Sequence, residues 1–132
     1  MIGLDTNVLV RYLVEDDEAQ ASVAAALVEG LTEEQPGFAS LVAMVELVWV
    51  LRRSYRIPER EVFSVLDRLL SVDGIRFERS DVVRRAMRDA VTTSTDFADA
   101  LIARLGTSAG CTTTMTFDRV AAELDSMTLL DS

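Results

Sequence analysis

The sequence predicts an α/β fold in a single domain, with a central, mainly parallel sheet of four to five short strands flanked by helices. Two observations predict it. Short apolar segments with β-favouring residues alternate along the chain with longer segments of helical periodicity. The chain also has 132 residues, 49% of them hydrophobic, which is enough to bury one core. Strands that alternate with helices are typical of a parallel sheet with helices on its faces.

The predicted strands are short and are bounded by turn-forming or acidic residues. The first is expected to be buried and to run directly into Asp5, and the fourth is rich in hydroxyl side chains. In chain order the strands cover residues 2–4, 38–39, 74–77, 111–116 and 127–130.

Helical spacing of apolar residues predicts the helices. Four of them begin directly after a residue that favours a helix start, namely Asp17, Ser40, Pro58 and Ser80. In chain order the helices cover residues 7–14, 18–31, 41–51, 59–71, 81–91 and 97–105, and a short helix follows Asp118. The helix at 41–51 is apolar at every position except Glu46, so we expect it to be buried.

The composition excludes several kinds of catalysis. The chain has 22 acids and no histidine, and its 13 basic residues are all arginine, which leaves a formal net charge of −9. Without histidine or lysine there is no Ser-His-Asp triad, no His-bearing zinc site, no P-loop lysine and no Schiff base. The one cysteine, Cys111, cannot form an internal disulfide or an all-thiolate metal site. Any catalysis must therefore rest on carboxylates, with a metal ion supplied from outside.

The sequence contains no signal that directs it to a membrane. No apolar run is long enough to span a bilayer, and the N-terminal segment lacks the basic start of a secretion signal. We therefore expect no membrane association and a cytoplasmic location.

Several acids are predicted to lie where ligands bind in a parallel sheet, beyond the carboxyl ends of the strands. Asp5 ends the first strand and Asp118 follows the fourth, while Asp96 and Asp99 share one face at the start of a helix. Taken singly, capping or a favourable position in the helix dipole is the simpler explanation for each.

Glu46 is harder to explain, because five apolar residues stand on each side of it. A buried carboxylate costs several kcal/mol unless it is paired or binds a metal. The alternatives are an ion pair with an arginine or exposure on a narrow polar stripe of the helix.

Considered together, Asp5, Glu46, Asp99 and Asp118 come from four separate elements that can face the same end of one sheet. Four adjacent carboxylates repel one another, and divalent cations relieve this repulsion. Oxygen ligands suit Mg²⁺ or Mn²⁺ and argue against zinc or copper. Clustered carboxylates with such ions are suited to phosphodiester hydrolysis.

The chain resembles the PIN-domain ribonucleases over residues 1–132, specifically the VapC toxins of bacterial type II toxin–antitoxin systems. The resemblance rests on LDTNVLV at 4–10, the Glu46-Leu47 pair, DFADALIA at 96–103 and TMTFD at 114–118. It implies that the acidic catalytic and metal-binding centre consists of Asp5, Glu46, Asp99 and Asp118, with Asp96 as an auxiliary acid. It also implies supporting roles for the polar neighbours Thr6, Asn7, Ser40 and Thr116.

The resemblance further implies a Mg²⁺-dependent endoribonuclease that forms a homodimer and is inhibited by a cognate antitoxin, whose C-terminal segment covers the active-site groove. The net charge of −9 suits a basic antitoxin segment but suits RNA poorly, because phosphate contacts normally need a basic surface. Two groups of arginines could form such a surface, although each is also explained as a solvated helix face: Arg52, Arg53, Arg56 and Arg60, and Arg84, Arg85 and Arg88.

Two other functions remain open from the sequence. A haloacid-dehalogenase-like phosphate-transfer domain also has an Asp after its first strand, but it typically has a second acid where this chain has Asn7, and it uses a lysine. A catalytically silent PIN-fold interaction module would be expected to have lost some of the acids. We expect Trp49 to lie in the core or a dimer interface and Cys111 to be an inert strand residue.

Overall fold

The computed structural model describes residues 1–130. The chain divides into two compact units, Met1–Glu78 and the residues from Arg79 onward. The predicted single domain covers residues 1–132, and the last two of these lie outside the described residues.

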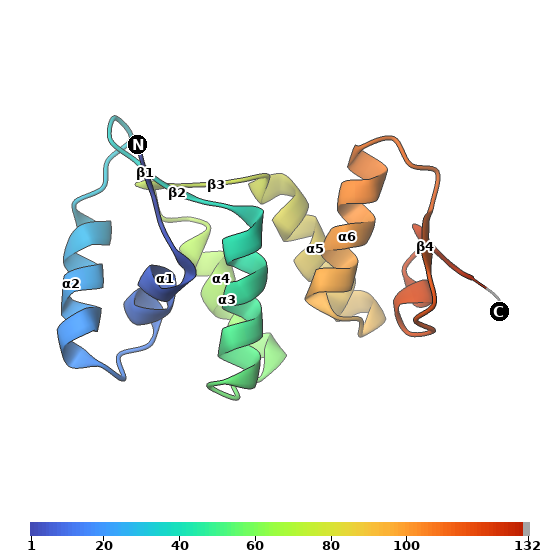
Figure 1. The fold of residues 1–132 in the computed structure, drawn as a ribbon, viewed down its shortest axis with the longest axis horizontal. Helices are drawn as coiled ribbons and strands as arrows, with labels where there is room; N and C mark the ends of the chain where they lie inside the picture. The colour runs from blue at the N-terminus through green and yellow to red at the C-terminus, as the bar shows by residue number, and fades with distance from the viewer. Residues whose placement is uncertain (131–132) are drawn as a thin grey trace. The chain divides into compact units, whose positions relative to one another are not determined.

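The first unit is built on a three-stranded parallel sheet (Figure 1). Its strands lie in sequence order, with Ile2 opposite Gly37 and Gly37 opposite Ile75. They are β1 (Ile2–Gly3), β2 (Gly37–Ala39) and β3 (Ile75–Phe77). Parallel strands need a crossover connection, and two helices occupy each crossover. These are α1 (Thr6–Leu13) and α2 (Glu18–Glu29) between β1 and β2, and α3 (Leu41–Arg53) and α4 (Glu59–Leu69) between β2 and β3.

Side-chain caps fix the starts of α2 and α3, as the sequence predicts. The carboxylate of Asp17 accepts the N–H of Gln20 at 3.0 Å, and the hydroxyl of Ser40 accepts the N–H of Ala43 at 3.1 Å. The short helix α1 lies between α2 and α3 and contacts both (Figure 1). Its side chains Leu9 and Val10 are buried, so packing rather than intrinsic helix propensity holds it in place.

One glycine of the first unit is required by the packing. A Cβ atom at Gly74, just before β3, would lie 2.7 Å from the carbonyl oxygen of Leu31. No real side chain tolerates that distance, so the backbone after α2 approaches the start of β3 only because residue 74 is glycine.

The second unit contains two α-helices, a short 3₁₀ helix and a two-stranded parallel sheet. Its elements are α5 (Ser80–Thr93), α6 (Phe97–Ser108), β4 (Thr114–Thr116), the 3₁₀ helix η1 (Ala121–Glu123) and β5 (Met127–Leu129). A two-pronged ion pair joins α5 to α6, with Nε of Arg104 2.5 Å from Oδ2 of Asp89 and Nη2 2.9 Å from Oδ1. Paired contacts of this kind are the strong form of an arginine–carboxylate interaction.

The α/β class and the parallel strand pairing are confirmed, while several local predictions are wrong. β1 is exposed rather than buried: Ile2 is 48% exposed, and only the following Leu4 is buried. Ser80 does not cap α5 but is its first residue, after Arg79 in a left-handed conformation (φ 50°). β4 begins at Thr114, so Cys111 lies outside the strand, where it is exposed.

Across the part of the chain that the structure describes, no helix is both long enough and apolar enough to cross a membrane.

Candidate functional site

Polar side chains follow each strand of the three-stranded sheet at its carboxyl edge. Asp5 comes two residues after β1, Ser40 directly after β2 and Glu78 directly after β3. The backbone N–H of Glu78 donates to the carbonyl of Ala39 at 2.9 Å, and its carboxylate accepts the N–H of Leu41 at 2.8 Å. Glu78 is not among the acids predicted from the sequence, although it directly follows a predicted strand, which is the pattern that indicates Asp5.

Asp5 caps α1, as its simpler explanation predicts. Its Oδ1 accepts the backbone N–H of Thr6 at 2.8 Å, and the side chain lies on the exposed part of the unit. A carboxylate has two oxygens, each able to accept more than one contact, so capping leaves Asp5 able to bind a cation. Capping and metal binding are therefore compatible at this position.

Thr6 is the one buried polar side chain for which the described residues provide no partner. The residue is 5% exposed, and its Oγ1 forms no hydrogen bond with any described group. Buried hydroxyls in native proteins are nearly always satisfied, so an unsatisfied one directly after Asp5 calls for an explanation.

Replacing Thr6 with valine tests this hydroxyl directly. Thr6→Val keeps the branched shape and removes Oγ1, whose unsatisfied burial costs about 1–3 kcal/mol. We expect the free energy of unfolding, measured by urea denaturation without metal, to stay unchanged or rise by about 1 kcal/mol. Thr6→Ser, which keeps the hydroxyl and loses the methyl group, serves as the control and should destabilise the protein. A loss of more than about 1 kcal/mol in Thr6→Val would show that Oγ1 has a partner in the folded protein.

Glu46 is exposed, so the expectation of a wholly buried helix around it is wrong. One face of α3 buries Met44, Leu47 and Leu51, but the opposite face carries Glu46 between Val42, which is 69% exposed, and Trp49, which is 59% exposed. Trp49 is therefore not a core residue. Apolar sequence alone did not reveal this face, because its residues are as hydrophobic as those that are buried.

Asp96, Asp99 and Asp118 all belong to the second unit. Asp96 immediately precedes α6 but makes no side-chain cap, so capping does not explain it. Asp99 lies in the first turn of α6 and is half-buried. Asp118 caps the turn before η1: its Oδ1 accepts the N–H groups of Val120 at 2.8 Å and Ala121 at 3.1 Å. The hydroxyl of Thr116 accepts the N–H of Asp118 at 3.0 Å and so holds its backbone.

The negative charges of Asp96 and Asp118 act on Asp99. Burial raises the pKa of Asp99 above its ordinary value, and the negative charges of Asp96 and Asp118 raise it further. Like-charged carboxylates around a half-buried one are the situation that a bound divalent cation relieves, and oxygen ligands suit Mg²⁺ or Mn²⁺. The donor chemistry therefore fits such an ion, although within residues 1–130 no three acidic or thiol groups lie close enough together to hold one.

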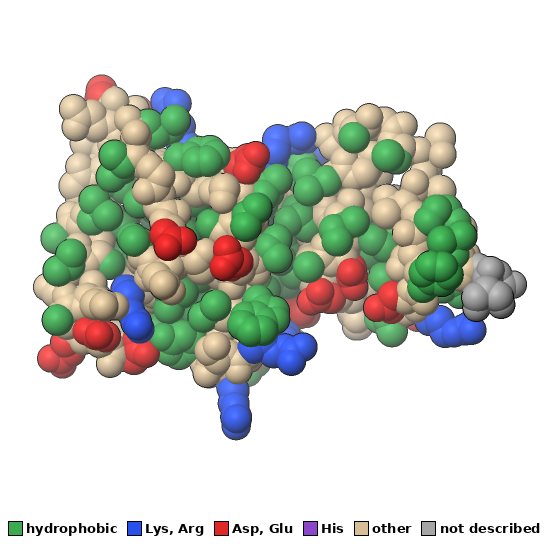
Figure 2. All heavy atoms as spheres, viewed as in Figure 1, with side chains coloured by type: hydrophobic (Ala, Val, Ile, Leu, Met, Phe, Trp, Pro, Cys, Tyr) green, Lys and Arg blue, Asp and Glu red, His purple; other side chains and the backbone are tan. Residues whose placement is uncertain are grey.

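The arginines do not gather into one basic surface on the face drawn in Figure 2, where the blue side chains lie at several separate places among red and green ones. Arg52 is paired with Glu59 at 3.3 Å, as expected for a solvated helix face. Arg53, Arg56, Arg85 and Arg88 are exposed.

Comparison with known proteins identifies the fold family. The family model described as "PIN domain" matches residues 2–126, which extends over both units. PIN domains are generally metal-dependent nucleases, so the match supports a nuclease and does not favour the haloacid-dehalogenase alternative. A search of curated proteins found no match.

Proposed function

Because this chain belongs to the PIN domain family, we propose that it is a Mg²⁺-dependent endoribonuclease, the VapC-type toxin of a toxin–antitoxin pair. The observation that carries the proposal is the environment of Asp99, which is half-buried and acted on by two further acids. A carboxylate whose ionised form is disfavoured in this way gains from a cation beside it.

In this proposal Asp5, Glu46, Asp99 and Asp118 hold Mg²⁺ or Mn²⁺, and Asp96 is an auxiliary acid. The bound metal would activate water and stabilise the charge that develops on the phosphodiester during hydrolysis. The chain itself supplies the acids and holds them: Thr116 and the N–H groups of Val120 and Ala121 orient Asp118, and the N–H of Thr6 orients Asp5. Ser40 fixes the start of the helix that carries Glu46.

The absence of histidine and lysine supports this choice of chemistry. Carboxylates with divalent ions can hydrolyse a phosphodiester without either residue, whereas most other phosphate-transferring sites use one of them. Asn7 is exposed one residue after Thr6 and can support the acids or contact RNA from the same helix end.

The proposed partners are RNA, a second copy of the chain and a cognate antitoxin in the cytoplasm. The formal charge of −9 supports a basic antitoxin segment, because opposite charges speed and strengthen such an encounter. For RNA, bound cations would have to offset part of that charge.

The proposal is tested by incubating the purified chain with structured and single-stranded RNA in Mg²⁺, in Mn²⁺ and in EDTA. We expect internal cleavage with either metal and none in EDTA. Cleavage that continues undiminished in EDTA, or no cleavage of any RNA with either metal, would refute the nuclease. Single-stranded DNA of the same sequence serves as the control for RNA specificity.

A further inference from the structure

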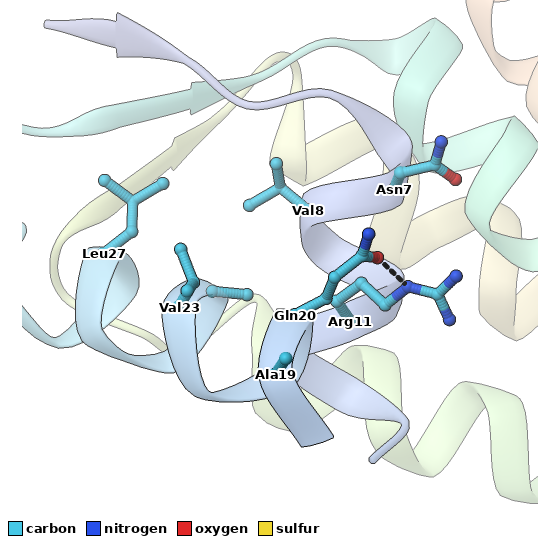
Figure 3. Close-up of a pocket in the computed structure, with 8 residues that line it drawn as sticks. Asn7, Val8, Arg11, Ala19, Gln20, Val23 and Leu27 are labelled. Atoms are coloured by element: carbon cyan, nitrogen blue, oxygen red, sulfur yellow. Dashed lines mark hydrogen bonds between the residues drawn. The ribbon is translucent and has the colours of Figure 1, made fainter. Parts of the chain in front are cut away.

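The side chain of Arg11 joins three separate segments of the first unit. Arg11 lies on α1. Its Nε donates a hydrogen bond of 2.6 Å to Oε1 of Gln20, which lies at the start of α2 (Figure 3). Its Nη1 donates to Oδ1 of Asp16 at 2.8 Å, in the link between the two helices, and to the hydroxyl of Tyr55 at 3.2 Å. Tyr55 lies two residues after α3 ends.

The network closes on itself. The hydroxyl of Tyr55 donates to Oδ2 of Asp16 at 2.9 Å, so both oxygens of that carboxylate are used. The hydrogen bond from Tyr55, followed by the positive charge of Arg11, holds the pKa of Asp16 below its ordinary value, and Asp16 in turn raises the pKa of Tyr55. Asp16 is therefore ionised at neutral pH, and its hydrogen bonds to Arg11 and Tyr55 fix its orientation.

Stability alone does not account well for such a network. The side chain of Arg11 is 29% exposed and that of Asp16 46% exposed, and ion pairs at this exposure contribute only about 0–1 kcal/mol. Orientation of a metal ligand has a larger effect: losing a residue that orients such a ligand lowers metal affinity by about 10- to 100-fold. The network is therefore better suited to fixing a direction than to supplying free energy.

The direction that it fixes is that of α1, which carries Asp5 at its start. With 8 residues, α1 is too short to be stable alone, so its contacts decide how it lies. Arg11 is six residues after Asp5, about 9 Å along a helix that rises about 1.5 Å per residue. Leu9 and Val10 bury the apolar side of α1, and Arg11 ties its polar side to α2 and to the end of α3, the helix that carries Glu46. The Asp5 carboxylate accepts the first N–H of α1, from Thr6, so a change in the direction of α1 changes the direction of this carboxylate.

We propose that Arg11, Asp16, Gln20 and Tyr55 form a positioning clamp that holds α1, and with it the Asp5 carboxylate, in the orientation needed to bind a divalent cation. The clamp acts through Asp5 and does not touch the metal or RNA. The inference rests on the proposed function, because it concerns one of the acids assigned to the metal.

A direct role for Arg11 in binding an RNA phosphate is the rival explanation. Three of its N–H groups are already engaged, and Asp16 at 2.8 Å neutralises its charge locally. If Arg11 bound a phosphate of RNA, its replacement would raise the KM for RNA and leave the affinity for the metal unchanged.

Tyr55→Phe in the full-length chain tests the clamp, because it removes only the hydroxyl that links Arg11 and Asp16 to the end of α3. We expect the affinity for Mn²⁺, measured by electron paramagnetic resonance without RNA, to fall about tenfold, as when a residue that orients a metal ligand is lost. The Mg²⁺ concentration at half-maximal RNA cleavage should rise by a similar factor, while kcat at saturating Mg²⁺ and the KM for RNA change little.

Arg52→Gln is the matched control. It breaks the exposed pair with Glu59 at 3.3 Å, which joins α3 to α4 without reaching α1, so Mn²⁺ affinity should equal that of the wild type. Gln20→Ala, which removes one arm of the clamp, gives a second measurement if Tyr55→Phe does not fold, and should weaken Mn²⁺ binding in the same direction.

Unchanged Mn²⁺ affinity in both clamp variants would overturn the proposal, and so would a raised KM for RNA with unchanged Mn²⁺ affinity. A wild type that neither binds Mn²⁺ nor cleaves RNA would instead refute the proposed function. The two failures are therefore distinguishable.

Discussion

Asp99→Asn is expected to lower Mg²⁺-dependent RNA cleavage by about 1,000-fold or more, because a metal ligand that contributes several kcal/mol to the transition state is lost. Asp99 is half-buried, and the negative charges of Asp96 and Asp118 disfavour its ionised form. A neutral amide in its place removes this repulsion between carboxylates, so the variant should stay folded. The measurement is the initial rate of cleavage at saturating Mg²⁺, with circular dichroism to verify the fold.

Asp125→Asn is the matched control for this variant. It removes one negative charge from an exposed position of the same unit, outside the group of Asp96, Asp99 and Asp118. Wild-type activity in Asp125→Asn with loss in Asp99→Asn would assign the effect to the site. Equal activity in the wild type and Asp99→Asn would show that the cleavage comes from a contaminating ribonuclease or does not depend on this carboxylate.

Millimolar Mg²⁺ or Mn²⁺ is expected to raise the melting temperature of the wild type. A cation that binds only the folded chain stabilises it by about 2.7 kcal/mol at 100 times its dissociation constant. The same ions should produce a much smaller shift in Asp99→Asn, which lacks one of the proposed ligands. The melting temperatures are measured by differential scanning fluorimetry, with a sample in EDTA as the reference. An unchanged melting temperature of the wild type with both metals would count against the acidic site.

The pH dependence of this shift follows from the environment of Asp99. Its raised pKa means that the folded state holds the proton more tightly than the unfolded state. The metal-free protein therefore loses stability as pH rises from the ordinary pKa of an aspartate, about 3.9, through the raised pKa of the folded state. Metal binding needs the ionised carboxylates. The metal-induced rise in melting temperature should therefore be largest at neutral pH and disappear in acid, and a shift that stays constant across this range would contradict the assignment.

Local sequence patterns predicted the elements well where the determinant is local. Asp17 and Ser40 cap the helices that follow them, because a cap needs only a side-chain oxygen and an N–H three residues later. Prediction failed at Ser80, where Arg79 adopts a left-handed backbone that no short-range pattern announces. It failed also at the face of α3 around Glu46, because hydrophobicity without periodicity does not say which side of a helix is covered.

The candidate acids were identified from the sequence, but the contacts between residues far apart in the sequence were not. Asp5 and Asp118 were predicted because they follow predicted strands, and in the structure each lies two residues after a strand, β1 and β4 respectively. Glu78 was not selected, although it follows β3 and accepts the first N–H of α3. The clamp of Arg11, Asp16, Gln20 and Tyr55 joins residues up to 44 positions apart, and no sequence spacing predicts a contact of that range.

By itself, the sequence determined the α/β class, the family and the absence of catalysis by histidine or lysine, because these depend on composition, periodicity and residue identity. Only the tertiary structure decided that Glu46 and Trp49 are exposed, that Thr6 is buried without a partner, and that Asp99 is influenced by Asp96 and Asp118. Burial, hydrogen bonding and electrostatic interaction depend on which distant segments the fold brings together, and that information is not local to any stretch of the chain.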